Sequence, residues 1–287
     1  MLSRRTVLAA LAAPALCAQE RKSKMFGDAE AYERFMGRWS SLLAPLLVDF
    51  TGTSDGGQML DVGSGTGVLA FTVARRNPHC RVVGIDPSAE YVAYANSRNS
   101  FGDRAKFQTG DAQHLEFADA AFDHSLSLLV FNFIPDRARA LAEVVRVTKP
   151  GGRVSAAVWD YGGGMRMLRV FWDAVTATDP SAAKLDEAHM PLCRAGELGK
   201  LWRDGGLDAI EERPLDIDIK FAAFADYWDP FLLGQGPAGA YVRSLDERRR
   251  QALRGEVKRR LSVGAENAPL SLPARAWAVR GTVRRHG

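Results

Sequence analysis

Between residues 58 and 160, short apolar runs alternate with segments whose apolar residues recur at helical spacing. The apolar runs predict strands at 58–62, 81–86, 105–110, 123–129 and 153–158. The segments between them predict helices at 67–76, 88–98 and 136–148, the last with Asp136 as its N-cap and Pro150-Gly151-Gly152 as its stop. Strand–helix–strand units are right-handed crossovers, so the pattern predicts an α/β domain with a parallel sheet.

The flanking regions predict further helices and two more strands. Before the first strand, apolar residues at helical spacing predict an opening helix: Tyr32, Phe35, Met36, Trp39, Leu42, Leu43 and Leu46. After residue 160, helices are expected at 165–178 and 195–204 and an extended segment at 208–219. A capping box from Ser244 to Glu247 is expected to open a basic helix ending near 261, followed by a strand at 273–283.

We therefore expect a doubly wound, mostly parallel seven-stranded sheet of Rossmann-like form with a helical cap. The expected segments are 25–57 as an N-terminal helical part, 58–160 as the α/β core, and 161–287 as cap helices and last strands of the same sheet. Residues near 160–200 and 222–270 are expected to cap the carboxyl edge of the sheet.

Composition and charge argue against two classes of site, a nucleic-acid groove and a metal centre. The chain has 287 residues, 46% hydrophobic and 25% charged, with a net charge of +4. So small a surplus of positive charge does not favour a nucleic-acid groove. The cysteines at 17, 80 and 193 are too far apart for a metal-type pair or a disulfide framework, so we expect no metal.

The first residues allow two interpretations. Arg4-Arg5 precede a short, alanine-rich apolar run, which resembles a twin-arginine export leader over residues 1–24 and is too short to span a membrane. Alternatively, translation begins at Met25. We expect a cytoplasmic protein without stable membrane insertion, with export as the alternative.

The most informative segment is MLDVGSGTGVLA, residues 59–70. An apolar strand enters a turn with glycine at every second position, and a helix follows, so backbone N–H groups lie open to a ligand. A dinucleotide turn usually has G-x-G-x-x-G spacing and no carboxylate beside the pyrophosphate. Here Asp61 stands at the strand end, which favours S-adenosylmethionine, a ligand with an ammonium and a carboxylate but no phosphate.

Two further acids follow later strands. Asp86, 25 residues after Asp61, is expected to accept hydrogen bonds from ribose hydroxyls, or alternatively to cap the next helix ahead of Pro87. Asp111 is expected to face the adenine amine, or alternatively to be a turn residue.

These elements together resemble the class I S-adenosylmethionine-dependent methyltransferases, and most closely the small-molecule branch that includes the ubiquinone/menaquinone C-methyltransferases. The resemblance covers about residues 27–160 and includes Phe122-Asp123 to Asp136 and the Lys149-Pro150-Gly151-Gly152 turn. It implies a donor site formed by Asp61, Gly63, Ser64, Gly65, Gly67, Asp86, Pro87, Asp111, Ala112, Gln113 and Leu128. Many relatives carry a His after the fourth strand, where this chain has Asn132-Phe133, which argues against a proton relay at that position.

The resemblance implies methyl transfer to a small-molecule acceptor at oxygen or carbon, with no catalytic base identified. Candidates on the acceptor side are Asn132, Trp159 and Tyr161, with Asp160 and the aromatics of 226–231 as further candidates. The opening helix resembles one that closes over the donor, and Arg38 is a candidate partner for the donor carboxylate. Motifs for nucleic-acid base methylation are absent, and two cysteines outside the leader are too few for arsenite chemistry.

Two alternatives remain open at this point: a nicotinamide-dependent oxidoreductase and a non-catalytic S-adenosylmethionine-binding module. The sequence also leaves open the acceptor, the methylated atom and the oligomeric state.

Overall fold

The computed structural model describes residues 29–53, 55–262, 265 and 267–285. The leader or alternative start expected before residue 29, and Cys17 with it, lies outside these residues. Among the described residues, no helix is long and apolar enough to cross a membrane.

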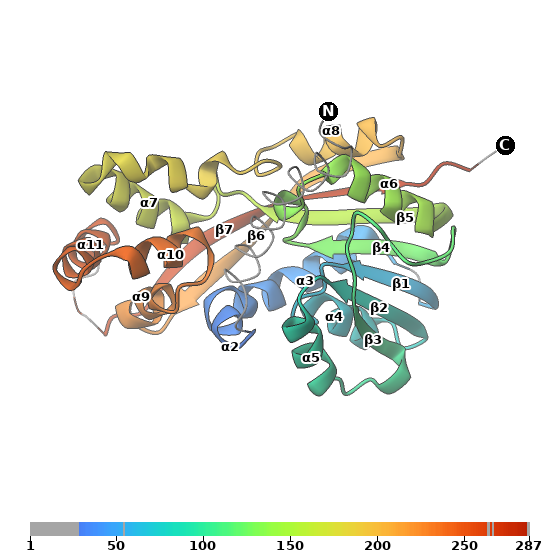
Figure 1. The fold of residues 1–287 in the computed structure, drawn as a ribbon, viewed down its shortest axis with the longest axis horizontal. Helices are drawn as coiled ribbons and strands as arrows, with labels where there is room; N and C mark the ends of the chain where they lie inside the picture. Colours follow the sequence, from blue (N-terminus) through green and yellow to red (C-terminus); the bar gives the residue numbers. More distant parts are fainter. Residues whose placement is uncertain (1–28, 54, 263–264, 266, 286–287) are drawn as a thin grey trace, which may run out of the picture.

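One sheet of seven strands runs through the described chain (Figure 1). Its order is β3-β2-β1-β4-β5-β7-β6, and β7 runs antiparallel to both of its neighbours. The strands are β1 (Gly57–Val62), β2 (Cys80–Asp86), β3 (Ala105–Thr109), β4 (Phe122–Leu128), β5 (Thr148–Trp159), β6 (Asp208–Phe221) and β7 (Leu270–Thr282). The predicted doubly wound, mostly parallel sheet is confirmed.

The helices divide between the two faces as right-handed crossovers require. The connections from β1 to β2 and from β2 to β3 proceed in one direction along the sheet and contain α4 (Val68–Arg76) and α5 (Ala89–Ser97). The connection from β4 to β5 proceeds the other way and contains α6 (Arg137–Val147), which covers the opposite face with α8 (Glu197–Asp204). The buried run at 154–159 in β5 reflects a strand covered on both faces.

The opening helix is continuous but changes its winding. It consists of α2 (Ala29–Tyr32), one π-helical turn η1 (Glu33–Gly37) and α3 (Arg38–Thr51). Leu43, Leu47 and Phe50 of α3 are at most 1% exposed, so this helix is part of the core. π-Helical turns are rare and often lie at functional sites, and η1 lies beside the glycine turn described below.

The remaining helices form a group at the left of Figure 1, beyond the carboxyl ends of β4 and β5. They are α7 (Arg166–Thr178), α9 (Phe224–Leu232), α10 (Gly236–Ser244) and α11 (Glu247–Arg260), and α7 contacts both α10 and α11. The 3-10 turns η4 (Pro180–Leu185) and η5 (Glu187–His189) follow α7; η2 (Gly102–Arg104) and η3 (Phe131–Phe133) lie in the core domain.

Two local predictions were wrong in detail. The N-cap of α11 is Asp246, which accepts from the Arg249 N–H at 2.8 Å, and not Ser244. Pro150-Gly151-Gly152 lies inside β5 and not before it, because β5 already pairs with β4 at Thr148 through a register shift opposite 122–124. By contrast, Asp136 is the N-cap of α6, as predicted, and accepts from the Arg139 N–H at 3.0 Å.

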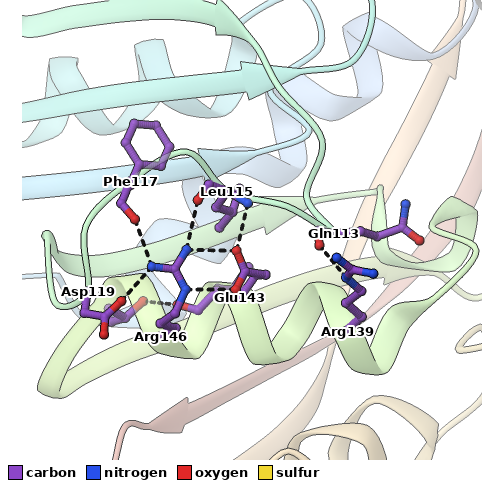
Figure 2. Close-up of polar contacts among 9 residues, drawn as sticks. Gln113, Leu115, Phe117, Asp119, Arg139, Glu143 and Arg146 are labelled. Atoms are coloured by element: carbon purple, nitrogen blue, oxygen red, sulfur yellow. Dashed lines mark hydrogen bonds and ion pairs between the residues drawn. The ribbon is translucent and has the colours of Figure 1, made fainter.

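The loop after β3 is fixed to α6 by one arginine (Figure 2). Arg146 donates to the carbonyls of Leu115 and Phe117 at 2.9 and 2.8 Å and pairs with Asp119 and Glu143. Glu143 in turn accepts from the Leu115 N–H at 2.9 Å, and its hydrogen bonds to Arg146 lower its pKa to about 2. This network sets the course of residues 111–119.

We expect Arg146→Met to lower the free energy of unfolding by about 1–3 kcal/mol, because two backbone carbonyls lose their donor. Chemical denaturation measures the change. Arg259→Met is the control: Arg259 is 70% exposed and, among the described residues, pairs with Glu256 of its own helix, so its loss should change the free energy of unfolding much less. If the two variants unfold at the same denaturant concentration, the network does not stabilise the loop.

Candidate functional site

The glycine turn between β1 and α4 is held by backbone hydrogen bonds to β2. The N–H groups of Gly63 and Ser64 both donate to the Ile85 carbonyl at 2.8 Å. Gly63 has a φ of +73°, and a Cβ there would lie 2.5 Å from Val130, so only glycine fits. Gly65, at φ +51°, has no heavy atom within 4 Å of its Cβ position, so a ligand can approach the backbone there.

Asp61 lies under this turn and is 2% exposed. Its Oδ2 accepts from the Ala70 N–H of α4 at 3.0 Å, whereas Oδ1 is buried without a hydrogen-bond partner among the described residues. Burial raises the pKa of Asp61 to about 7, the Ala70 N–H partly opposes the rise, and the Asp86 charge adds to it. The buried hydroxyl of Ser64 likewise has no partner among these residues. Two unpaired oxygens therefore lie in the turn, where a cationic or hydrogen-bonding ligand would satisfy them.

Asp86 ends β2, as predicted, but it is not the N-cap of the next helix. Its Oδ2 accepts from the Gly65 N–H at 2.9 Å and its Oδ1 from the Ser88 N–H at 2.9 Å, so it holds the glycine turn and the start of α5. The N-cap itself is Ser88, which accepts from the Tyr91 N–H at 3.3 Å. Burial raises the pKa of Asp86. Each carboxylate oxygen retains acceptor capacity for a ligand hydroxyl.

Asp111 is exposed and forms a local turn, accepting from the Gln113 N–H at 2.9 Å. Gln113 links this loop to α6, because its Oε1 accepts from the Asp136 N–H at 3.0 Å and its carbonyl accepts from Arg139 (Figure 2). Pro87 is exposed and Ala112 is half-buried. These residues line the edge of the sheet at β2 and β3.

The opening helix contacts the glycine turn through Glu33, a residue that the sequence did not single out, and it contacts α5 through Tyr32. Glu33 of η1 accepts a short hydrogen bond from the Thr66 hydroxyl, and Tyr32 packs on Tyr91 of α5 at a ring distance of 5.6 Å. Arg38 instead faces the cap: it pairs with Asp226 at 2.8 Å and stacks on Trp39. The structure therefore does not place Arg38 at the turn.

A small cavity of about 50 Å³ lies at the carboxyl ends of β4 and β5. Two of the predicted acceptor-side residues, Trp159 and Tyr161, line it. Its other lining residues are Tyr32, Phe35, Met36, Leu129, Phe133, Leu168, Glu187, Gly236 and Pro237. A more open depression of about 360 Å³ lies beside the ends of α3 and α4, away from every predicted site residue.

The third acceptor-side candidate, Asn132, is 3% exposed and does not line the cavity. Its amide group contacts the Met190 sulfur at 3.7 Å, and its Oδ1 has no hydrogen-bond partner among the described residues. Leu128 ends β4 and is 9% exposed. Asp160 caps the following turn by accepting from the Gly163 N–H at 3.0 Å.

The aromatics of 226–231 anchor the cap and do not line the cavity. The Tyr227 hydroxyl donates to the Met167 carbonyl at 2.8 Å. Phe231 stacks on Phe171 at 4.6 Å and meets Phe35, itself a cavity residue, at 5.2 Å. The cluster therefore supports the cavity wall indirectly, through Phe35.

Sequence reasoning missed Glu187, which no motif marks and which follows β5 by 28 residues. It is 6% exposed and lines the cavity, and it is discussed below. Only the path of the chain after α7 brings it there.

Comparisons with known proteins agree with this geometry. Residues 60–156 match the family described as "Methyltransferase domain". The chain is 28% identical to an arsenite methyltransferase of Halobacterium salinarum over 60% of this chain and 42% of that protein. It is 40% identical to the ubiquinone/menaquinone biosynthesis C-methyltransferase UbiE of Paracoccus denitrificans over 38% of this chain and 44% of that protein.

Among solved structures, the fold matches Haemonchus contortus phosphoethanolamine N-methyltransferase 2 in complex with S-adenosyl-L-methionine. The TM-score is 0.56 at 17% identity, over 93% of this chain and 59% of that chain. The chain spans about half the length of the first curated relatives it matches. The sheet order, the acid-lined glycine turn and the methyltransferase domain matched at residues 60–156 together show the class I S-adenosylmethionine-dependent methyltransferase fold.

Proposed function

We propose that this chain transfers the methyl group of S-adenosylmethionine to an oxygen or carbon of a small, largely apolar acceptor. The observation that carries the proposal is that two complementary half-sites adjoin at one edge of the sheet. The acid-lined turn lies at the ends of β1 and β2, and the aromatic cavity lies at the ends of β4 and β5. Because β1 pairs directly with β4, ligands bound in the two half-sites meet.

The residues of the turn fit the donor's charges. The unpaired Oδ1 of Asp61 would accept from the donor ammonium, and the open backbone of the turn would receive its carboxylate. Asp86 would accept from the ribose hydroxyls, with Pro87 beside it. Asp111, Ala112 and Gln113 would border the adenine, and Leu128 would flank the donor at the end of β4.

When bound, the donor supplies an activated methyl group, and the protein supplies orientation. Holding an acceptor atom in line with the methyl group contributes roughly 7–11 kcal/mol to lowering the barrier. The buried walls of the cavity, among them Trp159 and Tyr161, would exclude water from the reacting atoms.

A nicotinamide-dependent oxidoreductase fits this turn poorly. A pyrophosphate on the turn would lie next to Asp61, and two like charges about 4 Å apart cost about 4 kcal/mol at an effective dielectric of 20. A non-catalytic binding module would leave the aromatic cavity beside the turn without a role.

The name of the Halobacterium relative raises arsenite as an acceptor, and the described cysteines disfavour it. Cys80 starts β2, at the end of the strand away from the turn, and Cys193 is buried with a pKa raised to about 12 by desolvation. A reactive thiol needs a lowered pKa and access to solvent. An apolar organic acceptor suits the cavity better.

We place the activity in the cytoplasm, where the donor is made, and propose no nucleic-acid partner.

We expect stoichiometric binding of S-adenosylhomocysteine to the full chain and no saturable binding of NAD, both measured by calorimetry. Asp86→Asn should weaken the binding about 10-fold to 100-fold, because a charged hydrogen-bond acceptor is lost. Since Asp86 also holds the Gly65 N–H, thermal unfolding must confirm that the variant is folded. Asp103→Asn is the matched control, since the Asp103 side chain is 92% exposed. Saturable NAD binding without S-adenosylhomocysteine binding would refute the proposal.

Asp61 should make donor binding depend on pH. Because its pKa is raised to about 7, S-adenosylhomocysteine affinity should increase as pH rises from about 6 to about 7.5, with release of a proton. Calorimetry in buffers of different ionisation enthalpy measures that proton. Asp61→Asn should abolish the pH dependence and should weaken S-adenosylhomocysteine binding at about pH 7.5.

The same substitution should stabilise the ligand-free fold at pH 8. A folded-state pKa above the unfolded value of 3.8 gives stability that is complete below about pH 4 and is lost as pH rises through about 7. At pH 8 the buried charge is therefore destabilising, and Asp61→Asn removes it. A lower melting temperature for Asp61→Asn at pH 8 would contradict this account.

A further inference from the structure

Glu187 is the one carboxylate among the residues that line the cavity. It opens η5, where the chain passes from α7 toward α8, and it is 6% exposed. Its side chain reaches the ends of β4 and β5, the half-site assigned above to the acceptor.

The position of Glu187 is fixed by its neighbours. It accepts a short hydrogen bond from the Trp172 indole N–H of α7, and the Ala238 backbone of α10 lies beside it. The preceding Asp186 pairs with Arg169 at 2.6 Å and accepts from the Ala188 N–H at 2.8 Å, which holds the turn in place. The carboxylate is thus held at the cavity wall by three elements.

No ion pair to Glu187 is present among the described residues. The titratable groups near it are the Tyr161 hydroxyl of the cavity wall, the Cys193 thiol and the Asp186 carboxylate. All of them are neutral or acidic, and the nearby Arg169 is occupied by Asp186. A carboxylate buried without a cation persists at a cost in stability, and such groups concentrate where a ligand or a proton transfer uses them.

We propose that Glu187 accepts the proton of an acceptor hydroxyl, so that the acceptor is a small phenol-type molecule methylated on oxygen. This inference rests on the proposed methyl transfer and names its acceptor class. The apolar and aromatic walls would hold the ring, and the carboxylate would select the hydroxyl.

The O–H proton passes to a carboxylate oxygen of Glu187, and a lone pair of the acceptor oxygen forms the new O–CH₃ bond. The carbon–sulfur bond of S-adenosylmethionine breaks, and its electron pair remains on sulfur, giving neutral S-adenosylhomocysteine. Glu187 then returns the proton to solvent.

The protonation equilibrium of Glu187 suits this role. Burial raises its pKa to about 7, while the Trp172 hydrogen bond partly opposes the rise. A base is most effective when its pKa lies near the working pH. Tyr161 is a poor alternative base, because burial raises the pKa of its hydroxyl well above the usual value.

Entry of an acceptor requires movement of the cavity wall. A cavity of about 50 Å³ is smaller than an aromatic ring system, and Phe35 and Met36 cover it from the π-helical turn η1. Gly236 and Pro237, the first residues of α10, line it from the cap.

The first test measures binding without turnover. The full chain, saturated with S-adenosylhomocysteine, is titrated with 1-naphthol and with 1-methylnaphthalene, which has a similar shape but no hydroxyl. At pH 8 we expect 1-naphthol to bind at least about 10-fold more tightly, the advantage falling as pH drops below about 7. Glu187→Gln should remove both the preference and its pH dependence. Asp173→Asn, an exposed carboxylate next to Trp172 on α7, should leave both unchanged.

The second test follows methylation of 1-naphthol by S-adenosylmethionine. We expect kcat/KM to rise with pH through about 7, and Glu187→Gln to lose about 100-fold with a flat profile. Glu187→Asp, which keeps a carboxylate, should restore part of the activity and the pH dependence. S-adenosylhomocysteine binding should be unchanged in both variants.

The outcomes separate the two proposals. If the wild-type chain does not bind S-adenosylhomocysteine, the proposed methyl transfer is wrong. If it does, but 1-naphthol has no advantage over 1-methylnaphthalene, or Glu187→Gln keeps the wild-type pH profile, only the role of Glu187 is overturned.

Discussion

The reversal of strand order between β1 and β4 is the constraint on which the rest of the structure depends. Right-handed crossovers send α4 and α5 to one face and α6 to the other, so no connection fills the space above the ends of these two strands. The glycine turn and the aromatic cavity, the two parts of the proposed site, both lie at that opening. Asp61 stands on one side of it, and Trp159 and Tyr161 on the other.

The proposed site contains buried acids that have no cationic partner within the described part of the chain. Asp61, Asp86 and Glu187 are each less than 10% exposed, and burial raises the pKa of all three. Such groups lower the stability of the ligand-free fold, and ligands that supply an ammonium or a hydroxyl offset that loss. Active sites commonly show this relation, in which residues needed for function lower the stability of the fold. It also explains why Asp61 and Glu187 are expected to make binding depend on pH near neutrality.

The cap and the opening helix enclose the site together. Arg38 of α3 pairs with Asp226 of α9, and Phe35 of η1 packs on Phe231 of the same cap helix. A displacement of η1 would therefore disturb both the glycine turn, through Glu33 and Thr66, and the cavity. The same helical turn, η1, therefore borders both half-sites.

The sequence by itself determined the local elements, among them the glycine turn at which we propose that the donor binds. Apolar periodicity and the glycine turn depend on residues close together in the chain, which is why the strands were predicted to within a few residues, except for the early start of β5, and Asp136 was identified as a cap. The sequence could not show that Asp86 holds the Gly65 N–H, that Arg38 turns to Asp226, or that Glu187 reaches the ends of β4 and β5. Those contacts join residues separated by 21 or more positions. The pairing of β1 with β2 brings Asp86 to Gly65, and the packing of the cap brings Asp226 to Arg38 and Glu187 to the cavity.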